Sequence, residues 1–177
     1  MKDLYNIIEG MGHIQNRLGS GSSGTIYDLG NGKVRKIMRV KQGAARHNDN
    51  IAIERWAKVK KGLKVIPYIY DVDYDGYTMD KFETPCKEGD MIAKAIDCCL
   101  FTTKSSEWKE SRIDKLNKMF GEDDAQWIMQ WLKDFEQDYE LIMGANSKHS
   151  DDIRSANIGK DKKGNIVCFD WFDPYCY

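Results

Sequence analysis

The chain has little net charge, no long apolar run and no cysteines at metal-binding spacing. Its 27 Lys and Arg nearly balance 28 Asp and Glu, for a formal net charge of −1, so overall charge does not favour nucleic-acid binding. No segment approaches the length of a membrane span, and the N-terminus lacks the apolar run of a signal peptide. The five cysteines lack C-x-x-C spacing, which argues against a disulfide framework or zinc site and suits a reducing cytosol. We therefore expect a cytoplasmic protein without a membrane partner.

Charge is nevertheless distributed unevenly, although the chain contains no internal repeat. Residues 33–64 carry eleven Lys and Arg but only two acids, whereas residues 122–140 carry seven acids and one Lys. Both regions could be ordinary solvated surfaces. Alternatively, the basic region docks an acidic partner.

A carboxylate, an amide and a second carboxylate follow one another near the C-terminus. Asn157 lies five residues after Asp152, and Asp170 lies thirteen residues after Asn157. Asp and Asn are common in turns, so this spacing alone is a weak signal. It does supply what phosphoryl transfer needs, namely a base at the acceptor hydroxyl and oxygen ligands for magnesium.

A G-x-G-x-x-G motif lies near the N-terminus, with its glycines at Gly19, Gly21 and Gly24. The flanking residues predict strands over 13–18 and 25–29, whereas the Rossmann form of the motif should open a helix. Glycines let a backbone approach phosphates without a Cβ clash. The alternative is a flexible Gly/Ser loop tip.

Lys36 lies in residues 34–38, where apolar and basic side chains alternate as in a strand with one buried face. The following residues predict a helix over 44–61 that contains Glu54. In the simplest interpretation Lys36 is a solvated strand lysine, and Glu54 pairs with Lys58 along the helix.

The rest of the chain predicts a mixture of strands and helices that suits one domain. Strands are expected over 65–72, 77–81 and 166–169, with a hairpin turn at Gly164–Asn165. Helices are expected over 88–101, 105–120 and 122–143. The last is the strongest, because its apolar residues recur at helical spacing.

Together these motifs resemble the protein-kinase-like superfamily, with the glycine loop, Lys36, Glu54, Asp152, Asn157 and Asp170 in the family's order. The chain is most similar to the short serine/threonine protein kinases of T7-type phages, through residues 66–72 and 77–78 and the brief loop at 152–158. The resemblance implies an α+β, minimal bilobal fold in one domain, residues 1–177. A five-stranded small lobe would span about 1–82, and a truncated helical large lobe about 83–177.

The resemblance also implies roles for the catalytic residues. Asp152 would accept the proton of the attacking hydroxyl, while Lys36 would bind phosphate oxygens. Glu54 would pair with Lys36 and orient it. Arg154 lies where Ser/Thr kinases place a lysine beside the transferring phosphate, which tilts the acceptor toward protein.

The implied cofactors are ATP and Mg²⁺, with Asn157 and Asp170 as the metal ligands. Residues 80–83 would form the hinge that meets the adenine edge. The nucleotide-binding residues implied in this way are Gly19, Gly21, Gly24, Ile26, Val34, Met79 and Lys81.

The chain departs from the family pattern at several positions. Ser150 replaces the histidine that usually precedes the catalytic aspartate by two residues, and His149 is displaced by one. Phe172 replaces the final glycine of the metal-binding motif. Gly159 stands where a leucine usually forms the adenine floor. Only seven residues follow Asp170, so the usual activation segment and peptide platform are not expected.

Two classes of function remain open. The first is an active, minimal kinase that phosphorylates Ser or Thr in proteins, which the phage resemblance implies are host proteins, and that could depend on an activating partner. The second is a pseudokinase-like module that inhibits or sequesters a host factor. A small-molecule phosphotransferase is a further alternative. The presence of all five core polar residues favours an enzyme.

Overall fold

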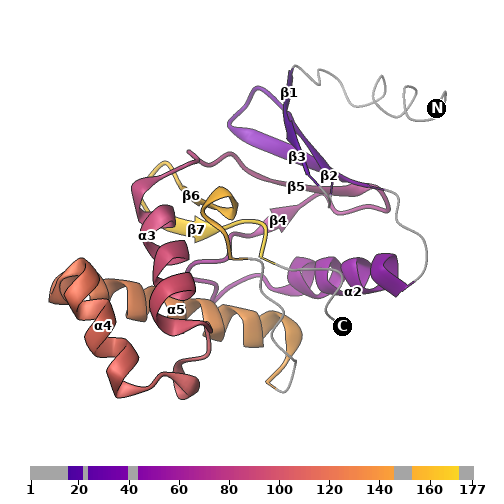
Figure 1. The fold of residues 1–177 in the computed structure, drawn as a ribbon. Helices are drawn as coiled ribbons and strands as arrows, with labels where there is room; N and C mark the ends of the chain where they lie inside the picture. The colour runs from indigo at the N-terminus through magenta and orange to yellow at the C-terminus, as the bar shows by residue number, and fades with distance from the viewer. Residues whose placement is uncertain (1–15, 22–23, 40–43, 146–152, 172–177) are drawn as a thin grey trace.

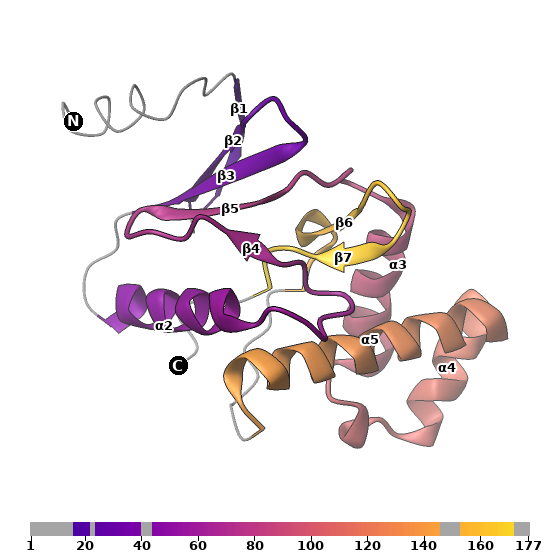
Figure 2. The same ribbon diagram turned by 180° about the vertical axis from the view of Figure 1, so that it is seen from behind.

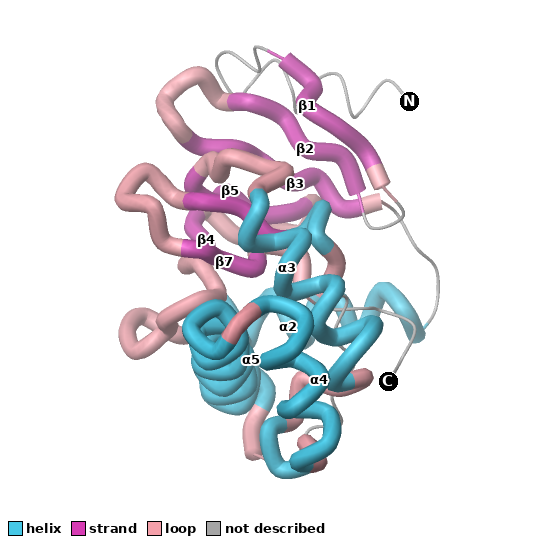
Figure 3. Tube along the Cα trace, turned by 60° about the vertical axis from the view of Figure 1, so that its left-hand side comes forward, coloured by secondary structure: helices cyan, strands magenta, loops and turns pink. Residues whose placement is uncertain are grey.

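The computed structural model describes residues 16–21, 24–39, 44–145 and 153–171. A five-stranded antiparallel sheet has the order β1-β2-β3-β5-β4. Its strands are β1 (Asn16–Ser20), β2 (Gly24–Asp28), β3 (Lys33–Met38), β4 (Ile69–Tyr70) and β5 (Gly76–Asp80). The sheet gathers at one end of the molecule and the long helices at the other (Figure 3). The predicted α+β fold with a five-stranded small lobe is confirmed.

Helix α2 (Ala44–Lys58) lies between the sheet and the large lobe, and it ends three residues before the predicted 61. The Val59 N–H bonds back to the Trp56 carbonyl, a tighter turn than an α-helix makes. Gly62 then adopts a positive φ of 95°. The α2 face that includes Ala52 and Trp56 is fully buried. Figure 2 shows α2 beside the C-terminal end of α5 (Glu122–Met143), where Arg55 Nη1 donates to the Met143 carbonyl at 2.8 Å.

The strand predicted over 65–72 is wrong at both ends, because β4 contains only Ile69 and Tyr70. The backbone N–H groups of Lys64, Val65 and Ile66 donate to the Asp138 carboxylate on α5 instead of to a neighbouring strand. Strand β4 ends at Tyr70, and the next residue, Asp71, has a positive φ of 45°. A carboxylate distant in sequence therefore accepts the N–H groups that were expected to pair with a neighbouring strand.

The large lobe contains α3 (Lys87–Ala95), a π-helical turn (Ile96–Leu100), α4 (Glu110–Phe120) and α5 (Figure 1). The α5 bounds match the prediction. The helix predicted over 105–120 is interrupted, because residues 105–107 form a separate 3₁₀ turn. The N-cap of α4 is Lys109. Ser105 instead fixes the 3₁₀ turn to α5, because its N–H and hydroxyl both donate to Glu136. No helix in the described parts of the chain is long and apolar enough to cross a membrane.

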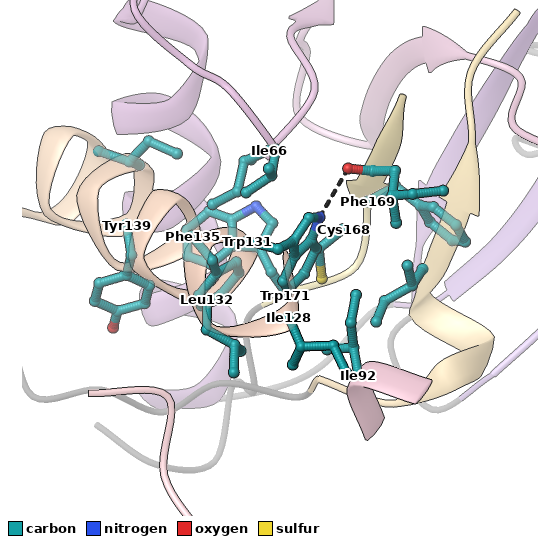
Figure 4. Packing of buried hydrophobic residues seen from close by; sticks show 14 of the residues in the cluster. Ile66, Ile92, Ile128, Trp131, Leu132, Phe135, Tyr139, Cys168, Phe169 and Trp171 are labelled. Carbon is teal, nitrogen blue, oxygen red and sulfur yellow. Dashed lines mark hydrogen bonds between the residues drawn. The ribbon is translucent and has the colours of Figure 1, made fainter. Parts of the chain in front are cut away.

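A short hairpin, β6 (Ile158–Lys160) and β7 (Ile166–Cys168), connects the two lobes. The Trp131 indole N–H on α5 donates to the Ile166 carbonyl at 2.9 Å (Figure 4). An aromatic chain crosses the interior, in which Trp56 packs edge-on against Tyr77 on β5 and against Trp171. Trp171 in turn packs edge-on against Tyr139 of α5. This continuous core fixes the segment after β7 against both lobes.

Candidate nucleotide site

A cavity of about 230 Å³ lies between the sheet and the large lobe. Five of the predicted nucleotide-binding residues line it, namely Gly19, Ile26, Val34, Met79 and Lys81. Its other lining residues come from the edge of β1, the segment after β5, and the two ends of the β6–β7 hairpin, and they are Leu18, Phe82, Thr84, Ala156 and Phe169. The lining is mostly apolar with a few polar groups, as in sites that bind flat organic ligands.

The three glycines of the motif have different environments. A Cβ on Gly24 would lie 2.3 Å from the Ile37 carbonyl oxygen, so this glycine permits close pairing of β2 and β3. A Cβ on Gly19 or Gly21 would meet no atom within 4 Å among the described residues. The Gly21 N–H donates to the Gly24 carbonyl at 2.9 Å, closing the turn. Gly19 alone of the three lines the cavity, and the motif's central residues 22–23 lie outside the described residues.

Lys36 is almost fully buried on β3, and its ammonium donates to Asp170 Oδ1 at 2.6 Å. A lysine buried this deeply needs an anionic partner, because an unpaired buried charge is costly. The expected Lys36–Glu54 ion pair is not formed. Glu54 is exposed, and it lines a second cavity of about 240 Å³ with residues of the loop before β5 such as Val72 and Tyr74. The α2 residues Ala52, Ile53 and Trp56 take the inward positions, so the helix orientation turns Glu54 away from Lys36.

Asn157 and Asp170 are brought together by the β6–β7 hairpin. Asn157 ends a 3₁₀ turn just before β6, and its carbonyl accepts the Phe169 N–H at 2.9 Å. Asp170 is the residue after Phe169. The backbone pairing of Asn157 with Phe169 therefore brings the backbones of Asn157 and Asp170 close together. One carboxylate and one amide oxygen, completed by phosphate and water, fit the preferences of Mg²⁺. Elsewhere among the described residues, no group of three or more His, Cys, Asp or Glu side chains could hold a metal.

The hinge segment after β5 has one edge free of strand pairing. The Lys81 N–H donates to the Gly32 carbonyl, so Lys81 directs its backbone toward the β2–β3 turn. In an extended chain, neighbouring residues direct their backbone groups to opposite sides, so those of Asp80 and Phe82 point away from Gly32. On that side β4 pairs only with Thr78 and Met79. Among the described residues, this edge of Asp80 and Phe82 therefore has no strand partner.

Lys81 also ties the hinge to the glycine-loop strands. Its ammonium donates to Asp28 Oδ2 at 2.5 Å, and the Gly30 N–H donates to Asp28 Oδ1 at 2.9 Å. The Lys81 hydrogen bond, followed by that of Gly30, lowers the pKa of Asp28. Lys81 thus contributes its stem to the cavity wall while its charge is held by the end of β2.

The proposed base Asp152 lies outside the described residues, as do His149, Ser150 and Phe172. Arg154 is described and exposed, immediately before the 3₁₀ turn that contains Asn157. Sequence reasoning placed Phe82 within the predicted hinge without naming its ring as a lining group, and it missed Phe169. Phe169 directly precedes Asp170, and that adjacency was the available signal, but no local pattern distinguishes a cavity-facing phenylalanine from a core one.

Comparison with known proteins shows loose structural resemblance and no sequence match. No protein-family model matches the chain, and no curated protein matches it in sequence. Among solved structures, one that resembles it is the ternary complex of APH(2″)-IIa with streptomycin and ATP, at 15% sequence identity and a TM-score of 0.43. The match covers 98% of this chain and 74% of that one.

Proposed function

We propose that the chain is a phosphotransferase that uses ATP and Mg²⁺. The observation that carries the proposal is the Lys36–Asp170 ion pair beside the apolar cavity, in which the lysine is buried and the carboxylate is partly exposed. Val34 and Phe169 line the cavity. Lys36 lies two residues after Val34, and Asp170 directly follows Phe169, so both charged residues adjoin the cavity wall. A nucleotide with its base in the cavity would extend its phosphates toward these two charges, where a cation and a metal ligand are needed.

In the proposed reaction the chain mainly positions and neutralises charge. Lys36 would exchange its contact with Asp170 for phosphate oxygens, which leaves Asp170 and Asn157 to hold Mg²⁺. The ion would neutralise charge on the phosphates. The glycine loop at Gly19 and Gly21 has room for close approach of the backbone. Asp152 would orient the acceptor hydroxyl and take its proton.

We propose a Ser or Thr hydroxyl of a protein as the acceptor, in a host cell if the T7-type phage resemblance holds. Exposed Arg154, near the metal ligands, suits a phosphorylated product, and the basic region suits an acidic protein partner, which could also be activating. A small molecule with a hydroxyl group is an equally compatible acceptor, because the nucleotide site does not determine which acceptor binds beside it. The absence of a Lys36–Glu54 pair favours the second candidate, a pseudokinase-like module that binds nucleotide and inhibits or sequesters a host factor.

The test is transfer of radiolabelled γ-phosphate from ATP to proteins of a bacterial lysate and to a panel of small alcohols. Asp170→Asn keeps the shape of the side chain but removes its charge, and it should lower transfer by at least two orders of magnitude. Asp114→Asn, at an exposed position on α4, is the matched control and should behave as wild type. Equal transfer by wild type and Asp170→Asn would refute the proposal. Binding of ATP without any transfer would favour the binding module.

A further inference from the structure

Gly159, in the middle of β6, lies against the hinge more closely than any other residue type would allow. A Cβ at this position would lie 2.9 Å from the Glu83 carbonyl oxygen and 2.9 Å from the Phe82 Cβ. It would also lie 3.2 Å from Cε1 of Phe169. Two of these neighbours are a backbone atom and a Cβ, which cannot move without moving the hinge itself. The glycine is therefore required by packing rather than by a positive φ.

This close approach joins the hinge to the hairpin. Glu83 and Lys160 exchange two backbone hydrogen bonds of 2.9 Å each. Lys160 Nζ also pairs with Glu88 at the start of α3, at 3.0 Å. The Thr84 hydroxyl donates to the Ile158 carbonyl at 3.0 Å. The hinge is thus fixed directly over β6.

The space above Gly159 is occupied by two phenylalanine rings. Phe82 from the hinge and Phe169 from the end of β7 stack with their centroids 5.7 Å apart and their planes 13° from parallel. Both rings line the cavity. The opposite wall is aliphatic and consists of Leu18, Ile26 and Val34 from the sheet. A flat ligand between these walls would contact an aromatic surface on one side and aliphatic side chains on the other.

We infer that the Phe82–Phe169 pair binds the base of the nucleotide. The inference rests on the proposed function and deepens it. Flat π-systems pack well on an aromatic ring, and the larger face of a purine gains more than that of a pyrimidine. Gly159 contributes indirectly, because it allows the two rings to meet where a larger residue would separate them. The site should therefore prefer ATP and GTP to CTP and UTP.

The test is to measure the dissociation constants of ATP and inorganic triphosphate by calorimetry, both with Mg²⁺. Triphosphate has the charges but lacks the base, so it reports the phosphate and metal contacts alone. Phe169→Leu keeps an apolar side chain and should weaken ATP roughly tenfold, since stacking of a base on an aromatic ring is worth this order of affinity. Triphosphate affinity should stay within about twofold. Phe120→Leu, a half-buried phenylalanine on α4, is the matched control and should change neither value.

Phe169 is almost fully buried, so a second variant guards against loss of folding. Phe82→Leu alters a half-buried ring of the same pair and should show the same selective loss for ATP. Unchanged ATP affinity in both variants, or equal losses for ATP and triphosphate, would overturn the inference. In those cases ATP still binds the wild type, so the proposed function survives. If wild-type protein binds neither ligand, the proposed function fails and the inference fails with it.

Discussion

Replacement of Asp138 by alanine should strongly destabilise the fold, although this residue lies outside the proposed site. Its carboxylate is 1% exposed and accepts the N–H groups of Lys64, Val65 and Ile66 at 2.7 to 3.0 Å. Val65 and Ile66 are buried, so water cannot readily replace the lost acceptor. A buried donor without a partner costs about 1–3 kcal/mol. Two such donors, on Val65 and Ile66, with a smaller contribution from the exposed Lys64, give an expected loss of about 3–5 kcal/mol.

The loss can be measured by urea unfolding, followed by circular dichroism. A fall in the midpoint at constant slope would show lost stability rather than a change in the unfolded state. Asp134→Ala is the matched control, one turn earlier on α5. Asp134 pairs with a Lys64 side chain that is 50% exposed, and such pairs contribute about 0–1 kcal/mol. A loss below about 1 kcal/mol for Asp138→Ala would refute the reasoning, because the three N–H groups would then have other acceptors.

Two further predictions follow from the same structure. Burial raises the pKa of Asp138, against the lowering effect of the hydrogen bonds from Ile66, Val65 and Lys64, so the folded chain retains this proton to higher pH than the unfolded chain. The free energy of unfolding of wild type relative to Asp138→Asn should therefore decrease as pH rises from the pKa of Asp138 in the unfolded chain to its pKa in the folded chain. Urea titrations at several pH values measure this slope. An increase with pH would show that burial is not the dominant effect. Gly24→Ala should lower the free energy of unfolding by about 2 kcal/mol or more, because its Cβ would overlap the Ile37 carbonyl. Gly21→Ala should change the free energy of unfolding by under about 1 kcal/mol. Equal losses of stability in the two variants on thermal unfolding would contradict this difference.

Much of the fold was predictable because its signals are local. Helix α5 has buried residues at regular helical spacing, and its bounds matched the prediction. The strands around the glycine motif were placed within a few residues. By contrast, Val65 and Ile66 have strand-forming side chains, but their N–H groups bind Asp138, more than seventy residues later. No pattern within either segment indicates that contact.

The candidate site divides in the same way. Gly19, Ile26, Val34, Met79 and Lys81 were predicted from motif position, and the structure brings them to one cavity. The Lys36–Glu54 pair was predicted but is not formed, because it depends on the orientation of α2 against the sheet, which spacing in the sequence does not determine. The stacking of Phe82 on Phe169 was not predicted, because it depends on the close approach at Gly159.

The aromatic chain through the core gives the protein a built-in optical reporter. Trp56 and Trp171 lie with their ring centroids 5.6 Å apart and their planes at 72°, close enough for their electronic transitions to couple. Trp56 belongs to the same helix as Glu54, and Trp171 directly follows Asp170. A rotation of α2 would thus disturb the indole next to Asp170 through the packing of the two rings. Near-ultraviolet circular dichroism of the unlabelled protein should register such a movement, and Trp56→Phe should abolish the coupled signal.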